Sequence, residues 1–133
     1  MKAVNDELFK VEKLEHTDGL IKAELSINPD SPIFRGHFPG QPVVPGACML
    51  QIVKEVLEGA LGQSLQIKKA GNLKFISMID PLVTSSVQLE IAYKFIEDAI
   101  SLTAKLSDGD RVCFKCSAVA ARFAIAGVVT GNR

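Results

Sequence analysis

The sequence predicts an α+β fold in which one long helix is covered by a mostly antiparallel sheet of five or six strands. Two observations predict it: several segments alternate apolar and polar residues, and one segment spaces its apolar residues three and four positions apart. The first pattern is typical of half-buried strands and the second of a helix with one buried face. Because the 133 residues suit a single hydrophobic core, we expect one domain over residues 1–133.

Six segments are typical of strands, and they lie at residues 8–15, 19–27, 68–79, 85–95, 99–106 and 111–123. Turns are expected around residues 17–19, at Asp98 and in the sequence SDGD at 107–110. Each turn joins two neighbouring segments, which favours antiparallel hairpins.

Residues 28–45 concentrate prolines and glycines, so this part of the chain is expected to be irregular. From Gly46 the spacing predicts a helix of about four turns that ends at Gly59 or Gly62. A long helix wrapped by a curved antiparallel sheet is the hot-dog arrangement, and a generic α+β sandwich is the alternative.

Charge and hydropathy exclude several classes of partner. Fifteen basic and fifteen acidic side chains cancel, so no overall field attracts nucleic acid or an anionic membrane. Asp6, Glu7 and Lys10 interrupt the amino terminus where a signal peptide needs an apolar run, and no stretch reaches the ~18 apolar residues of a membrane span. We therefore predict a cytoplasmic protein with no nucleic-acid partner and no membrane span.

The three cysteines, Cys48, Cys113 and Cys116, do not suggest a disulfide framework. Cys113 and Cys116 form a C-x-x-C pair, but they fall in a predicted strand, where residues three apart point to opposite faces. No second pair accompanies them, so we predict neither a metal site nor redox chemistry.

The loop before the helix holds the strongest candidate for chemistry, the run GHFPGQPVVPG at residues 36–46. Its prolines and glycines restrict the position of His37, and a rigidly placed imidazole suits a general base. Pro45 and Gly46 then open the helix, whose first amides lack intrahelical partners and can polarise a carbonyl. A packed loop histidine and a Pro-Gly helix start without a ligand are the alternatives.

This run resembles the signature of the β-hydroxyacyl-acyl carrier protein dehydratases, in which G-H-F-P-G, a variable residue, P, two apolar residues and P-G lead into the central helix of a hot-dog fold. LKFISMIDPL at 73–82 resembles the strand after that helix, and SDGDRVCFKCSAVAARF at 107–123 resembles the closing hairpin. The similarity covers roughly residues 5–124.

The resemblance implies a homodimer whose sheets join edge to edge, with two active sites at the interface and a substrate carried on the phosphopantetheine of acyl carrier protein. It implies that His37 is the base and that Gly46 lies at the oxyanion site. Ala47, Pro45 and Phe38 are expected beside the substrate. No metal or other cofactor is expected.

One residue departs from this pattern. The family places Glu or Asp fourteen positions after the histidine, where this chain has Gln51. An amide can hydrogen-bond a β-hydroxyl but has no proton to deliver at neutral pH, and losing a general acid typically costs ~10² to 10⁴-fold in rate. Glu55 lies one turn further along, about 5.4 Å in rise, and its simplest interpretation is a solvated side chain.

Two further sets of residues are candidates for substrate recognition. A local basic patch could attract the acidic carrier protein, although a solvated strand end explains the same residues, which are Arg35, Lys68, Lys69 and Lys74. Apolar residues could line an acyl tunnel or could be ordinary core, and these are Phe38, Val44, Met49, Phe75 and Ile76.

The leading hypothesis is a dehydratase-like protein that acts on, or binds, β-hydroxyacyl-acyl carrier protein in fatty acid or polyene-type synthesis. His37 could perform both proton transfers, or a water held by Gln51 could replace the acid. Alternatively, the chain is a degenerate subunit that completes a dimer with an active paralogue. An acyl thioesterase, in which Gln51 orients water, and a binding module without activity are the other hypotheses.

Overall fold

The computed structural model describes residues 8–35 and 42–122, and the statements below concern these residues. Along the chain the elements are β1 (Phe9–Thr17), β2 (Leu20–Ile27), the 3₁₀ helix η1 (Pro32–Arg35), α1 (Gly46–Leu61), β3 (Leu65–Phe75), β4 (Ser86–Ile96), β5 (Ala99–Asp108) and β6 (Arg111–Arg122). The strands form one antiparallel sheet in the order β1-β2-β4-β5-β6-β3.

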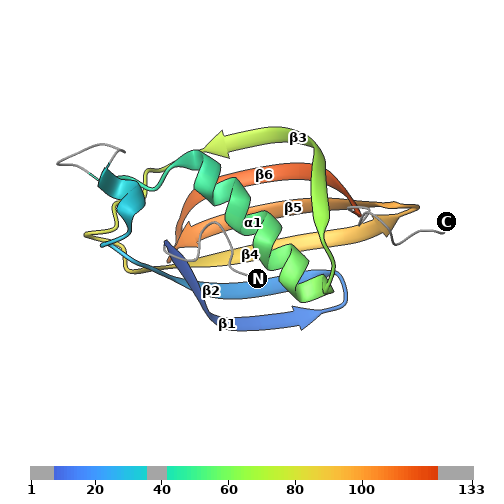
Figure 1. Cartoon of the computed structure of the whole chain (residues 1–133), viewed down its shortest axis with the longest axis horizontal. Helices are drawn as coiled ribbons and strands as arrows, with labels where there is room; N and C mark the ends of the chain where they lie inside the picture. The colour runs from blue at the N-terminus through green and yellow to red at the C-terminus, as the bar shows by residue number, and fades with distance from the viewer. Residues whose placement is uncertain (1–7, 36–41, 123–133) are drawn as a thin grey trace.

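Helix α1 lies across one face of this sheet, and both edges of the sheet curve toward it (Figure 1). The inward side chains of the strands and the buried face of α1 form one apolar core. In β4, for example, Val87, Leu89 and Ile91 alternate with exposed residues and are at most 1% exposed. This is the hot-dog fold, so the predicted fold is confirmed and the generic sandwich is not what the chain forms.

The two ends of α1 are built differently. Pro45 precedes the helix in an extended conformation, with ψ 144°, and offers no side-chain cap. At the other end Gly62 has φ +69°, a conformation that glycine adopts at little cost, and its N–H donates to the Glu58 carbonyl over 2.8 Å. Of the two predicted ends, Gly62 is therefore the one that the structure has, and the helix runs through Gly59.

Strand β3 differs from the predicted segment 68–79, because it begins at Leu65 and ends at Phe75. The strand stops there because the N–H groups of Ile76 and Ser77 both donate to the Cys113 carbonyl, over 2.8 and 3.2 Å, so the regular ladder cannot continue. The chain then turns inward, and Ile79 is completely buried.

The two cysteines of the C-x-x-C pair are both buried in β6. Strict alternation along the strand would place one of them inside and the other outside, so that prediction is wrong. The cause is a β-bulge. Phe114 pairs with Leu106 but Val112 pairs with Ser107, which leaves Cys113 as the extra residue. Burial raises the pKa of both thiols. Within residues 8–35 and 42–122, no group of three or more His, Cys, Asp or Glu side chains could hold a metal ion.

In the same two ranges, no helix combines the length and the apolar character needed to cross a membrane.

Candidate active site

The amino-terminal end of α1 is covered by an aromatic ring. A Cβ atom added to Gly46 would lie 2.6 Å from Cε1 and 2.8 Å from Cζ of Phe75, which is closer than carbon atoms can approach. Phe75 in turn stacks on Phe114 with ring centroids 5.1 Å apart. Any larger residue at position 46 would therefore force the Phe75 ring to move. Packing is thus a second reason for glycine here, beside the approach of a substrate that the sequence analysis considered.

A hollow of about 350 Å³ lies beside this contact. Its lining includes Gly46 and four of the predicted tunnel residues, which are Val44, Met49, Phe75 and Ile76. The buried Val44 and Met49 belong to the core, whereas Phe75 and Ile76 are 57% and 52% exposed. The structure thus brings the predicted oxyanion residue and these four tunnel residues together, and two of the four are more exposed than ordinary core.

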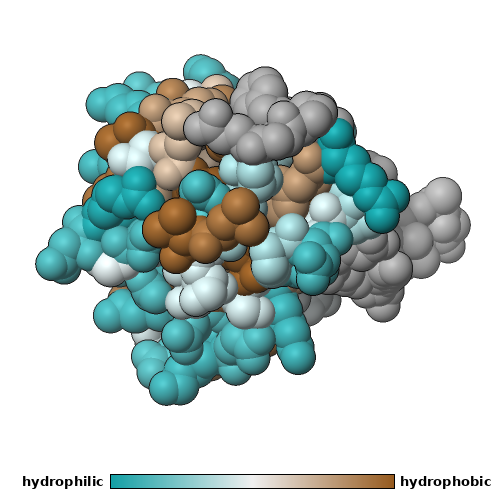
Figure 2. Space-filling model, turned by 90° about the vertical axis from the view of Figure 1, so that its left-hand side faces the viewer, coloured by the Kyte–Doolittle hydropathy of each residue, from teal (hydrophilic) through white to brown (hydrophobic). Residues whose placement is uncertain are grey.

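Figure 2 views the molecule from the end at which α1 begins. Apolar surface gathers on this end, between hydrophilic surroundings. Three apolar residues between β3 and β4 are largely exposed to solvent: Met78, Leu82 and Val83, with exposed fractions of 66%, 71% and 81%. The helix start therefore faces an apolar surrounding, which suits an acyl group better than a strongly hydrated ligand.

Gln51 is fixed by a neighbour on its own helix. Its Nε2 donates a hydrogen bond of 2.8 Å to Oε2 of Glu55, one turn further along. A carboxylate only accepts hydrogen bonds, so the amide must present its NH₂ group to Glu55 and its carbonyl oxygen elsewhere. The interpretation of Glu55 as merely solvated is wrong, because Glu55 is half-buried and bonded to Gln51.

The hydrogen-bonded pair Gln51 and Glu55 separates two grooves along α1. Gln51 and Ala47 line a groove of about 530 Å³ that extends to Leu65 and Ile67 of β3. Glu55 lines a smaller apolar groove of about 220 Å³ on the side of β1. Gly46, predicted at the oxyanion site, and Ala47, predicted beside the substrate, thus border two different hollows.

Cys48 lies one turn before this pair and is buried, with 7% of its surface exposed. Its burial raises the pKa of its thiol, and the negative charge of Glu55 raises that pKa further. The thiol is therefore protonated at neutral pH and is a poor nucleophile.

Two predicted site residues, His37 and Phe38, lie outside the described residues. The other histidine of the chain, His16, is on β1, and its Nε2 lies 2.6 Å from the Tyr93 hydroxyl. Its hairpin is at the end of the molecule where α1 ends (Figure 1). His16 is therefore separated from the helix start by the length of α1.

The predicted carrier-protein patch is distributed over two elements. Arg35 ends η1, whereas Lys68, Lys69 and Lys74 are exposed on β3. Lys68 approaches Oε1 of Gln66, at 3.4 Å, and Lys74 pairs across the sheet with Lys115. The pairing of β3 with β6 thus places Lys115, which is not one of the predicted patch residues, beside Lys74.

A sheet that wraps one central helix, with a Pro-Gly helix start facing an apolar hollow, places the protein in the hot-dog class. Within this class the chain belongs to the ApeI-like dehydratase family, whose sequence model matches residues 12–118. The resemblance to acyl carrier protein dehydratases noted in the sequence is thereby confirmed at family level.

Two curated relatives are named 3-hydroxyacyl-[acyl-carrier-protein] dehydratase FabZ. The chain is 29% identical over 89 residues to that of Haemophilus influenzae (strain PittEE), a match that covers 63% of this chain and 60% of the relative. It is 29% identical over 102 residues to that of Mannheimia succiniciproducens, a match that covers 70% of this chain and 67% of the relative. The match to the Haemophilus relative thus spans less than two thirds of that protein.

Solved structures share the fold at lower identity. The dehydratase heterocomplex ApeI:P from Xenorhabdus doucetiae contains a chain with a TM-score of 0.70 and 20% identity, covering 92% of this chain and 100% of that one. Cj0977, a sigma28-regulated virulence protein from Campylobacter jejuni, has a TM-score of 0.68 at 8% identity, with coverage of 96% and 92%. Such identities show the fold alone.

Proposed function

We propose that the chain is a dehydratase of β-hydroxyacyl thioesters carried by acyl carrier protein, which forms a trans-2-enoyl thioester and water in fatty acid or polyene-type synthesis. One observation carries the proposal: the motif at 36–46 leads into a helix whose first residue borders an apolar hollow. The family to which the chain belongs supports the same reaction class.

The helix start supplies the oxyanion donors in this proposal. The Cys48 N–H already donates to the Pro45 carbonyl, over 3.1 Å. The amides ahead of it, those of Gly46 and Ala47, are the first of the helix and have no carbonyl one turn earlier within α1. They would bind the thioester oxygen while the acyl chain lies against Phe75 and Ile76.

Proton transfer is assigned to His37. Its imidazole takes the proton from the carbon next to the thioester, and the electron pair forms the C=C bond as the bond to the β-hydroxyl breaks. The same imidazolium returns the proton to the departing hydroxyl, so that water leaves. Gln51 accepts a hydrogen bond from the β-hydroxyl through its Oε1, the atom that the bond to Glu55 leaves available.

A second candidate is a subunit that lends His37 to the carboxylate of a paralogue. Gln51 in the position of the family's acid favours it, and a dehydratase of similar fold has been solved as a heterocomplex. Either assembly would pair sheets through β3, an eleven-residue strand at the edge of the sheet. Homodimer, heterodimer and the cytoplasmic location all stay predictions.

The test is one assay on the purified chain with a short β-hydroxyacyl thioester, in which enoyl formation and free thiol are both followed. Enoyl product without thiol release is expected, and His37→Ala should lower the rate by ~10² to 10⁴-fold. Thiol release would instead identify a thioesterase. Activity that appears only after co-expression with a carboxylate-bearing paralogue would favour the second candidate, and full activity of His37→Ala would contradict the assignment of the base.

A further inference from the structure

The outer face of the sheet, opposite to α1, carries a row of charges that runs through all six strands. Cross-strand pairing places in one line Glu15, Lys22, Glu90, Lys105, Lys115 and Lys74. On β1, β2 and β4 the signs alternate, so each charge has an opposite neighbour. On β5, β6 and β3 three lysines follow one another, and Lys115 has a lysine on both sides.

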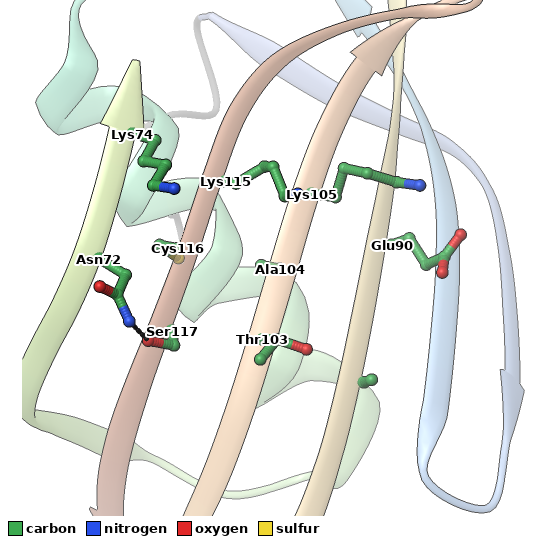
Figure 3. Close-up of a pocket in the computed structure, with 10 residues that line it drawn as sticks. Asn72, Lys74, Glu90, Thr103, Ala104, Lys105, Lys115, Cys116 and Ser117 are labelled. Atoms are coloured by element: carbon green, nitrogen blue, oxygen red, sulfur yellow. Dashed lines mark hydrogen bonds between the residues drawn. The ribbon is translucent and has the colours of Figure 1, made fainter. Parts of the chain in front are cut away.

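Like charges directly opposite one another destabilise a sheet. The carboxylate next in line to this group is Glu90, which is paired with Lys105, and within residues 8–35 and 42–122 no ion pair within 4.0 Å involves Lys74, Lys105 or Lys115. Figure 3 shows the three side chains in a line, with Glu90 beyond Lys105. Three ammonium groups that face a single carboxylate leave an excess of positive charge, which suits an external anion.

The row borders a hollow of about 500 Å³, which we call the lysine basin and define by Lys74, Lys105, Lys115, Asn72, Thr103 and Ser117. Glu90 also lines it, on the side of Lys105. Beside the lysines, the next line of cross-strand neighbours on the same face consists of small residues, which leave a depression in the surface. These residues are Ala92, Thr103, Ser117 and Gly71. The basin is therefore a recess, into which a small ligand can enter, rather than a flat surface.

Polar groups on the floor are arranged to donate hydrogen bonds. Asn72 has φ +52° at an irregularity of β3, and its Nδ2 donates to the Ser117 hydroxyl over 3.3 Å. The Ser117 hydroxyl in turn donates a hydrogen bond to the Gly71 carbonyl, over 3.2 Å. The amide of Asn72 retains a second N–H for a ligand, and the Thr103 hydroxyl lies on the neighbouring strand (Figure 3).

We propose that the lysine basin binds an anion with linked phosphate groups, on the face of the sheet away from the candidate active site. Neighbouring strands are about 4.8 Å apart, so the three lysines span roughly 10 Å at the backbone. One phosphate cannot meet all three ammonium groups as well as two or more linked phosphates can. The proposal is independent of the proposed dehydration.

The probe is sodium pyrophosphate, added to the ¹⁵N-labelled full chain at constant ionic strength, and the measurement is the shift of backbone amide resonances. Saturable shifts are expected in β3, β5 and β6, with tighter binding than inorganic phosphate. Lys115→Gln should weaken binding at least tenfold. The matched control is Lys22→Gln, which removes the same charge from the same row between Glu15 and Glu90 and should change binding less than twofold.

A second readout does not depend on the ligand. At low salt, Lys115→Gln should raise the thermal midpoint by about 1–3 °C because it removes two repulsive pairs, and Lys22→Gln should lower it by a similar amount. Lys115→Gln should still turn over a short β-hydroxyacyl thioester at the wild-type rate, which separates this test from that of the dehydration.

Three results would overturn the proposal. The first is the absence of saturable shifts with pyrophosphate, and the second is equal weakening by Lys115→Gln and Lys22→Gln, which would indicate non-specific attraction. The third is an acidic carrier protein that shifts the same amides without competition from pyrophosphate, since the basin would then be a docking surface for a protein.

Discussion

The two ends of α1 differ in whether polar groups of the protein close them. At the carboxyl end Glu58 closes the helix: its carbonyl accepts from the N–H of Gly62, and its Oε2 accepts from the N–H of Leu65 over 2.7 Å and lies 3.4 Å from Nζ of Lys54. At the amino end no side chain caps the helix, and Phe75, Ile76 and Met78, all exposed, line the hollow beside Gly46. One end is closed by polar contacts, and the other has no side-chain cap and borders an apolar hollow.

The largest expected effect is at the amino end, from Gln51→Glu. The introduced carboxyl group would lie beside Glu55, and two carboxyl groups that share a site hold a proton on one of them at higher pH than usual. The variant therefore gains an acid at the position where the family has one, and enoyl formation should rise at least tenfold. Steady-state rates on the thioester measure this.

The control for this variant is Gln51→Glu combined with Glu55→Gln. Without the second carboxyl group the introduced acid loses its proton at lower pH, so part of the gain should disappear at neutral pH. If Gln51→Glu leaves the rate unchanged or abolishes it, then Gln51 does not lie in the site as proposed.

A smaller effect is expected at the carboxyl end, from Glu58→Ala. The change removes the acceptor of the Leu65 N–H and the partner of Lys54, and a hydrogen bond to a charged group contributes about 1.5–3 kcal/mol. The free energy of unfolding, measured in urea, should fall by about 2 kcal/mol, while the rate per folded molecule stays constant. A change in rate without a change in stability would contradict the separation of the two ends.

The smallest effect is expected from a pair of glycines near the end of α1. Gly62→Ala places a side chain at φ +69° and should lower the free energy of unfolding by about 1 kcal/mol. Gly59→Ala is the matched control, because a Cβ there meets no atom within 4 Å and alanine is the better helix former, so stability should rise by about 0.5–1 kcal/mol. If both variants changed the free energy of unfolding in urea in the same direction, Gly62 would not act as the cap.

Local patterns accounted for most of the fold. Alternation along β4 and β5 and the spacing along α1 predicted these elements with boundaries close to those found, because each pattern reflects one buried face. The bulge at Cys113 and the early end of β3 were not predicted, since both depend on hydrogen bonds between β3, β5 and β6. In the site, the motif located Gly46 but not the ring of Phe75 that packs on it.

The sequence by itself determined the family, the order of the elements and the unusual amide at position 51, since motif and periodicity are properties of contiguous residues. The tertiary structure alone decided which distant residues meet. It placed Phe75 over Gly46, and it aligned Lys74, Lys115 and Lys105 in one row. The physical reason is strand register: pairing between segments far apart in the chain fixes these neighbours, and a shift by one residue would move every side chain of a strand to the other face.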